Sequence, residues 1–242
     1  MKIVLWSFIF ILFICSSNAQ ITQWRGPIRD GHFPETGLLD EWPENGPERI
    51  LHVEGIGKGY SSPVLVDDMI YVTGMKDTLD YLSAIDMEGN INWQVPYGRS
   101  WTKSFPDTRS TAVVEDDRIY VQSGTGRVNC INRETGEVNW AVEIDENFET
   151  VYHRWGNSET PLIVDDLVIC SPAGEKTSVV ALNKMTGEKV WQSEPVGGPR
   201  LPGRVRLPQR TGEGARKTVH QKSPFRPNGQ NGLEWLASPR EI

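Results

Sequence analysis

Short apolar runs separated by tight polar turns dominate the chain from Thr111 to Val142. Val, Ile, Tyr and Trp fill the runs, while Asp, Gly, Asn and Thr fill the breaks between them. Branched and aromatic residues favour strands, whereas Asp, Gly and Asn favour turns. We therefore predict four short antiparallel strands in this stretch. They are residues 111–115, 118–123, 127–132 and 137–142.

The same pattern recurs along the chain. An Asp pair follows the first strand of each unit, and consecutive pairs lie 49 residues apart. Four-stranded units that repeat every 40 to 50 residues or so are typical of β-propeller blades. We find no helical periodicity after the N-terminal segment. The sequence thus predicts an all-β fold, a β-propeller with four-stranded antiparallel blades, of which about three are present as an incomplete ring. The Asp pairs are Asp67–Asp68, Asp116–Asp117 and Asp165–Asp166.

One tryptophan closes each unit, shortly after a turn that contains glycine. A large flat ring at that place can pack on the neighbouring blade, and its N–H can reach a backbone acceptor. We predict that these residues dock blade to blade and carry no chemistry. The Asp pairs are expected to be hairpin-turn residues, so no metal site is predicted. The docking residues are Trp93, Trp140 and Trp191, with Gly136 and Gly187 in the turns.

The N-terminus has the pattern of a secretory signal peptide, residues 1–19. Lys2 precedes an apolar run that ends at Ile14, and small residues lead to Ala19. We expect the mature chain to be secreted or periplasmic, with no transmembrane segment after cleavage. Residues 20–194 form the predicted partial propeller. Once Cys15 is removed with the signal peptide, Cys130 and Cys170 remain, and they either pair or stay as buried thiols.

Charge divides the chain into two parts. The net charge is −7, yet residues 195–242 hold nine Lys or Arg against three Asp or Glu and are rich in Pro and Gly. An acidic body argues against a nucleic-acid partner. Two interpretations of the tail remain open. It is either a flexible basic segment or a stretch translated out of frame, because the repeat stops abruptly near residue 195.

The repeat resembles the pyrroloquinoline-quinone-like (PQQ-like) propeller repeat. That family's pattern is Ala-x-Asp/Asn-x-x-Thr-Gly-x-x-x-Trp, and the segment from Ala181 to Trp191 matches it fully. The segment from Cys130 to Trp140 departs only at its first position. Other stretches, such as QWRGPIRDG from Gln23, are similar to a secreted bacterial branch labelled outer-membrane assembly-factor-like or alcohol-dehydrogenase-like. The resemblance further implies that Ile50–Glu54 is the last strand of a closing blade, with His52 where the docking Trp would stand.

Two long connections hold the candidate ligand-binding residues. Propeller ligands commonly bind at loops around one end of the axis. Arg can pair with a carboxylate, and Trp can stack on a flat ring. The same side chains could instead pack between blades. The candidates are Arg99, Trp101 and Arg109 in one loop, and His153, Arg154 and Trp155 in the other.

The predicted function is an exported binding or scaffolding module without its own catalytic site, acting on a protein partner or small ligand. The alternative is the N-terminal part of a PQQ-dependent alcohol or sugar dehydrogenase, and the resemblance would then imply PQQ and calcium as cofactors. Such enzymes often carry adjacent cysteines, which this sequence lacks. Gly55, Gly57 and Gly59 fail the dinucleotide fingerprint, because Tyr60 stands where its last glycine belongs.

Overall fold

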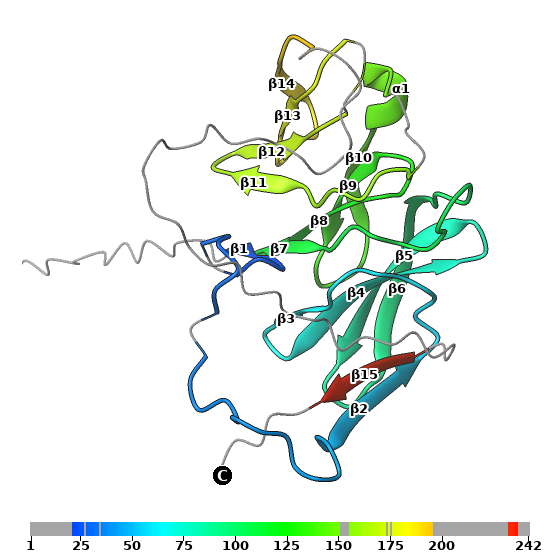
Figure 1. The fold of residues 1–242 in the computed structure, drawn as a ribbon. Helices are drawn as coiled ribbons and strands as arrows, with labels where there is room; N and C mark the ends of the chain where they lie inside the picture. The colour runs from blue at the N-terminus through cyan, green and yellow to red at the C-terminus, as the bar shows by residue number, and fades with distance from the viewer. Residues whose placement is uncertain are drawn as a thin grey trace, which may run out of the picture.

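A computed structural model describes residues 21–26, 28–33, 35–150, 155–172, 174 and 176–195, together with the backbone of 232–236. Three antiparallel sheets, each built on four consecutive strands, follow one another in chain order (Figure 1). The predicted all-β propeller fold with three blades is therefore confirmed. The signal peptide and most of residues 195–242 lie outside the described residues. No helix in the described part is long and apolar enough to cross a membrane.

Each blade is a meander whose first hairpin turns at the Asp pair. A two-residue hairpin of this kind needs positive φ, which Asp tolerates better than most residues. Asp67 and Asp68 have φ of 48° and 61°. The first blade comprises β3 (Val64–Val66), β4 (Met69–Lys76), β5 (Leu79–Asp86) and β6 (Ile91–Arg99). The second comprises β7 (Val113–Glu115), β8 (Arg118–Gln122), β9 (Arg127–Asn132) and β10 (Val138–Glu143). The third comprises β11 (Leu162–Val164), β12 (Leu167–Cys170), β13 (Val180–Asn183) and β14 (Lys189–Gln192).

The hydrophobic core lies between the blades. Side chains alternate across each sheet, so successive residues of one strand enter different interfaces. On β8, Ile119 and Val121 pack with the first blade, whereas Tyr120 packs with the third. The middle blade is thus apolar on both faces. Cys130 and Cys170 are both buried in the second of these interfaces as free thiols.

Segments from the two ends of the chain complete the described fold. A strand is present at the predicted residues 50–54 as β2 (Arg49–Glu54), which buries Leu51 and Val53 against the first blade. It pairs with β15 (Gly232–Leu236), a strand inside the tail that the sequence analysis did not predict (Figure 1). The N-terminal strand β1 (Ile21–Thr22) adds a fifth strand to the second blade's sheet, beside β7.

One short helix is present although the sequence shows no helical periodicity after its N-terminal segment. Residues Ile144–Phe148 form a single-turn helix, α1, directly after the last strand of the second blade. Ile144 and Phe148 stand four positions apart, and both enter the core between the second and third blades. Five residues are too few for helical periodicity to be recognised in the sequence. The turn ends at Glu149, which adopts a left-handed conformation with φ of 52°.

Candidate functional site

The first inter-blade contact is made by a tryptophan and a glycine. Trp93, on β6, donates its indole N–H to the carbonyl oxygen of Arg133 at 3.2 Å. Its ring lies over Gly136, where a Cβ atom would come within 2.8 Å of the ring. Only glycine leaves room for the indole there, and φ of 75° also favours it. Tyr71 completes the contact, with its ring centroid 6.1 Å from that of Trp93.

The second contact repeats the first almost atom for atom. Trp140 donates to the carbonyl oxygen of Lys184 at 3.0 Å, and its ring lies over Gly187. Tyr120 stands 6.1 Å from Trp140, as Tyr71 does from Trp93. Trp191, the corresponding residue of the third blade, is 41% exposed. The first two tryptophans therefore lie between blades, while the third lies on an outer face of the described structure.

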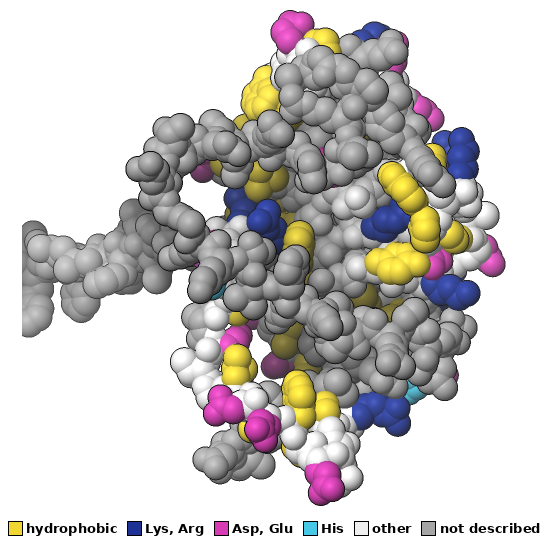
Figure 2. Space-filling view, in the orientation of Figure 1, with side chains coloured by type: hydrophobic (Ala, Val, Ile, Leu, Met, Phe, Trp, Pro, Cys, Tyr) yellow, Lys and Arg dark blue, Asp and Glu magenta, His cyan; other side chains and the backbone are white. Residues whose placement is uncertain are grey.

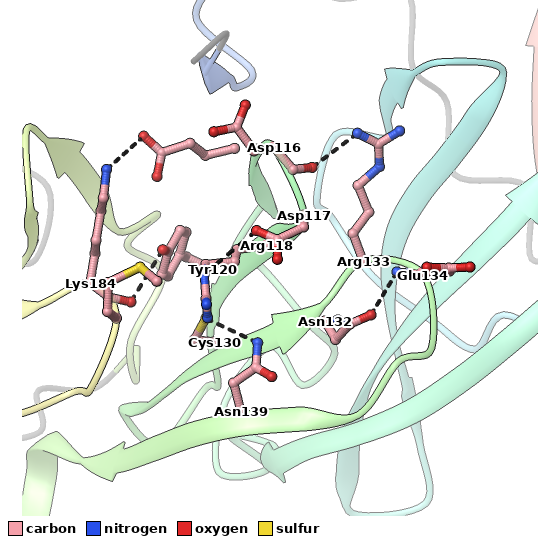
Figure 3. Close-up of polar contacts among 12 residues, drawn as sticks. Asp116, Asp117, Arg118, Tyr120, Cys130, Asn132, Arg133, Glu134, Asn139 and Lys184 are labelled. Atoms are coloured by element: carbon pink, nitrogen blue, oxygen red, sulfur yellow. Dashed lines mark hydrogen bonds and ion pairs between the residues drawn. The ribbon is translucent and has the colours of Figure 1, made fainter. Parts of the chain in front are cut away.

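A cation in each turn extends these contacts. Arg133 donates to the phenolic oxygen of Tyr71 at 3.1 Å and to the carbonyl oxygen of Asp116 at 3.0 Å. It also pairs with Asp67 of the first blade at 2.5 Å. Figure 3 shows how the guanidinium reaches the Asp116 carbonyl. One side chain thus ties a turn of the second blade to a hairpin of the first, and it gives the Asp pair a role beyond turn formation.

Lys184 holds the equivalent place between the second and third blades. Its ammonium lies 3.3 Å from the Glu115 carboxylate, which is buried. The Tyr120 hydroxyl donates to the Lys184 carbonyl oxygen at 3.2 Å (Figure 3). Burial raises the pKa of this phenol, and nearby Cys130 and Glu115 raise it further. Tyr120 therefore stays a neutral donor, which suits a structural role.

A buried thiol lies beside this contact. Two side chains of the same blade direct N–H groups at the Cys130 sulfur: Arg118 at 3.6 Å and Asn139 at 3.7 Å (Figure 3). The sulfur raises the pKa of the Arg118 guanidinium. Cys130 is fully buried. These contacts pin the centre of the second blade and give the thiol no route to solvent.

The long loop after β6 and the loop before β11 are joined by Arg109. Its guanidinium donates to the carbonyl oxygen of Trp155 at 2.5 Å and to that of Ser104 at 3.0 Å, and it also bonds the Phe105 carbonyl oxygen. The rings of Phe105 and Trp155 stand 5.2 Å apart, tilted by 38°. The sequence analysis missed Phe105. Its partner Trp155 was one of the candidate ligand residues.

The candidate residues differ in exposure. Trp101 is buried, covered by Gly156, and it donates its indole N–H to Ser104 at 3.1 Å. Arg99 accepts a hydrogen bond from Thr125 through its carbonyl oxygen at 3.0 Å. His153 and Arg154 lie outside the described residues. Phe105 and Trp155 are 63% and 39% exposed. Figure 2 shows hydrophobic and basic side chains lying together on the visible face of the molecule.

A buried carboxyl lies beneath the first of these loops. Asp80, on β5, is 1% exposed and accepts hydrogen bonds from the Ser100 hydroxyl and from the Gly124 N–H at 2.8 Å. Burial raises the pKa of the Asp80 carboxyl, while these hydrogen bonds and Arg109 oppose the rise. Asp80 therefore fastens the loop after β6 to a turn of the second blade.

A second buried carboxyl holds the third blade's loop. Glu159 accepts the Ser171 N–H at 3.1 Å, and burial raises the pKa of the Glu159 carboxyl. Its own N–H donates to Asn157 at 3.0 Å. Burial and the Glu159 charge together raise the pKa of the Cys170 thiol. Asp80 and Glu159 come from different blades, and each has a local structural partner.

Metal-binding groups do not gather in the described part of the chain. No three His, Cys, Asp or Glu side chains there come close enough to hold an ion. We therefore identify no calcium site among the residues that the structure describes.

Comparison with known families identifies the repeat. A family model described as outer membrane protein assembly factor BamB matches residues 78–215. The chain belongs to this family. The match includes the second and third blades, both docked tryptophans and part of the first blade. The predicted membership of the PQQ-like propeller repeats is thereby confirmed.

Proteins similar to this chain include enzymes. The quinohemoprotein alcohol dehydrogenase ADH-IIG of Pseudomonas putida is 26% identical over 151 residues, which cover 59% of this chain and 20% of the dehydrogenase. The chain thus spans about a fifth of that relative. BamB from Moraxella catarrhalis is 23% identical, with a TM-score of 0.41, covering 57% of this chain and 38% of that structure. A europium-containing methanol dehydrogenase is 17% identical, with a TM-score of 0.47, covering 61% and 27%.

The sequence analysis missed several residues of the inter-blade contacts. The sequence analysis assigned no role in these contacts to Tyr71, Tyr120, Arg133 or Lys184. Their signal is nonetheless present, because a cation stands three residues before the turn glycine in both units. It becomes recognisable only once the turn is known to face the preceding blade.

Proposed function

We propose that this chain is an exported binding module whose protein partner docks on the loops after β6 and before β11, without a catalytic site in this chain. The observation that carries the proposal is the ring pair of Phe105 and Trp155, exposed to solvent and fixed from below by Arg109. Exposed aromatic side chains beside arginine are enriched where proteins bind one another.

Rigidity supports a binding role for this face. Arg109 holds the backbone on which both aromatic rings stand, so little conformational entropy is lost when a partner covers them. Asp80 adds a second anchor from below through Ser100. A scaffold of packed blades that presents a few fixed aromatic side chains in loops suits recognition better than acid–base chemistry. The predicted signal peptide supports a periplasmic or extracellular location for this module.

A site-specific crosslinker tests the proposal in cells that express the chain naturally. A photoreactive phenylalanine replaces Phe105, and in a control it replaces Met87, which is also exposed but lies at the opposite end of β6. We expect a discrete protein adduct from position 105 that is absent from position 87. The adduct should disappear with Trp155→Ala, and the purified partner should bind that variant at least tenfold more weakly. Equal adducts at both positions, or none at 105, would refute the proposal.

The alternative function is the N-terminal part of a PQQ-dependent alcohol dehydrogenase. The similarity to the Pseudomonas putida enzyme favours it. PQQ would supply redox chemistry, and calcium would help to hold it. Since the described residues offer no cluster of three metal-binding side chains, we derive no catalytic step. Titration with PQQ and calcium, followed by dye-linked alcohol oxidation, separates the two functions. Tight binding with turnover would favour the enzyme and contradict the binding module.

A further inference from the structure

The two interfaces between the three blades are built from equivalent positions. Ser62, Thr111 and Thr160 lie 49 residues apart. The Thr111 hydroxyl accepts the Ser62 N–H at 3.0 Å, and the Thr160 hydroxyl accepts the Thr111 N–H at 3.3 Å. The same hydrogen bond therefore joins each blade to the next. Because this contact recurs at the same spacing, side chains at equivalent positions of the two interfaces can be compared.

One such position differs. Thr73 in the first blade corresponds to Gln122 in the second, again 49 residues later. The Thr73 hydroxyl lies 2.8 Å from the Ser61 hydroxyl and 3.1 Å from that of Thr108. It is also 3.1 Å from the Ser110 carbonyl oxygen. The polar side chain at this position of the first interface thus has protein partners on both blades.

Gln122 has no such partners. Its side chain is 1% exposed, and among the described residues neither the amide oxygen nor the amide nitrogen has a hydrogen-bond partner. The loop of the third blade covers this region, because the Asn157 N–H donates to the Gly124 carbonyl oxygen at 3.0 Å. Asn157 corresponds to Thr108, and Glu159 corresponds to Ser110. Asn157 and Glu159 thus hold the positions that Thr108 and Ser110 hold around Thr73 in the first interface.

An unpaired buried amide is costly. A buried donor or acceptor without a partner destabilises the fold, because it has given up its hydrogen bonds to water and gained none in return. Ordered water is the usual remedy, with about one buried water for every 27 residues in globular proteins and two to four polar partners for each. An amide offers both an acceptor and donors, and the surrounding loop supplies further polar groups. An apolar molecule would leave those groups without hydrogen bonds. The neutral Gln122 amide also has no charge with which to attract an ion.

We propose that the interface between the second and third blades encloses an ordered-water site, in which water bonded to the Gln122 side-chain amide joins it to the Asn157–Glu159 loop. At the equivalent position between the first and second blades, the Thr73 hydroxyl bonds directly to the next blade and needs no such water. The site lies beneath the loop that bears Trp155, and it stabilises that loop through water where the first interface uses hydroxyl groups.

Magnetisation transfer from water to side-chain amides tests this site on the full chain. We expect water cross-peaks at the Gln122 amide protons, with the sign of a long-lived bound molecule, and Gln122→Met assigns these resonances. Asn129 is the matched control. Its amide is equally buried but donates to the Tyr97 carbonyl oxygen at 2.6 Å, so it should show no such peaks. Absence of the peaks at Gln122, or equal peaks at Asn129, would overturn the proposal.

Thermal unfolding gives a second measurement. If water satisfies the Gln122 amide, Gln122→Met removes hydrogen bonds that span the two blades, and we expect the melting temperature to fall by a few degrees. If the amide is unsatisfied, methionine of similar size relieves its burial. A melting temperature that stays the same or rises would therefore also overturn the proposal.

Discussion

The indole of Trp93 lies on Gly136 of the following blade, and Trp140 lies on Gly187 in the same way. Each indole also donates to the carbonyl oxygen three residues before that glycine. The same contact thus occurs twice, and it consists of an indole ring, a glycine beneath it and one hydrogen bond from the indole N–H. Its parts can be removed one at a time.

Substituting the turn glycine should separate the blades. Gly136→Ala places a Cβ within 2.8 Å of the Trp93 ring at φ of 75°, so strain and overpacking should together lower the free energy of unfolding by about 2–4 kcal/mol. Urea denaturation measures this loss. Gly46→Ala is the control, because its φ of 76° is the same but nothing lies within 4 Å. It should cost only the backbone strain, about 1–2 kcal/mol. Equal losses would mean that the ring contact is unimportant.

The indole hydrogen bond can be removed separately. Trp93→Phe keeps an aromatic ring but leaves the Arg133 carbonyl oxygen without its donor, which should lower the free energy of unfolding by about 1–2 kcal/mol. Trp191→Phe is the comparison. Since Trp191 is 41% exposed, the same change there should stay within about 0.5 kcal/mol. Both values come from the same denaturation experiment, and a larger effect at 191 would contradict the docking argument.

The Arg133 contact should depend more on geometry than on charge. Arg133→Lys keeps the charge but cannot bond Tyr71, Asp116 and Asp67 together, so we expect a loss of about 1 kcal/mol. Asp67→Asn removes only an exposed ion-pair partner and keeps a residue that tolerates positive φ, so its effect should stay below about 0.5 kcal/mol. Chemical denaturation measures the stability lost in each variant. A loss for Asp67→Asn as large as that for Arg133→Lys would contradict this expectation.

Stability should depend on pH through Asp80. Burial raises the pKa of this carboxyl in the folded protein, so the folded state binds the proton more tightly than the unfolded state. Asp80 therefore destabilises the fold above its folded pKa, and that effect disappears as the pH falls toward its unfolded pKa. Asp80→Asn can still accept the Gly124 N–H and donate to Ser100. We expect this variant to be more stable than the wild type at neutral pH. The difference should disappear near pH 4, as Asp80 becomes protonated in both the folded and the unfolded protein.

Asp86 supplies a control of opposite sign. Hydrogen bonds from Asn90 hold the pKa of the Asp86 carboxyl below its usual range, so its stabilising effect is present at neutral pH and is lost on acidification. Asp86→Asn should therefore fall behind the wild type at neutral pH and approach it in acid. Denaturation curves collected from about pH 2 to 8 compare the three proteins, since the Asp86 effect is lost only below its unfolded pKa, and parallel pH profiles for the two variants would contradict both assignments.

Arg109 should control the mobility of the proposed binding face. Arg109→Lys removes at least one of the carbonyl bonds that join the two loops. We expect amide hydrogen exchange to rise severalfold in residues 99–109 and 155–160 and to stay unchanged in β8 and β9. Uniform acceleration would instead indicate global destabilisation.

The sequence predicted the repeat because its signal is local. Asp pairs, turn glycines and strand lengths are set by neighbours along the chain, so the strands of the second blade appear within one or two residues of their predicted bounds. Trp101 illustrates what was lost. It stands in a loop of polar residues, yet Gly156, far along the chain, covers it. The residues next to Trp101 in the sequence do not show that a distant segment buries it. The sequence therefore could not tell which side chains of the candidate loops are buried and which are exposed.

Pairings between distant segments were also hidden. β15 comes from a stretch without alternation, and its partner β2 lies at the other end of the chain. The Arg109 bonds to three carbonyl oxygens are likewise invisible in a sequence, because a backbone acceptor has no residue type. The sequence therefore indicated two candidate loops, and coordinates were needed to show which of their side chains are buried and what they contact.

The pairing of β1 with β7 has a consequence for the order of folding. Ile21 stands opposite Glu115, so β1 cannot pair until the whole first blade and the first strand of the second are available. Until then the middle sheet has no fifth strand. Pairing across so long a stretch of chain is slow, because the loop between the two strands has to close first.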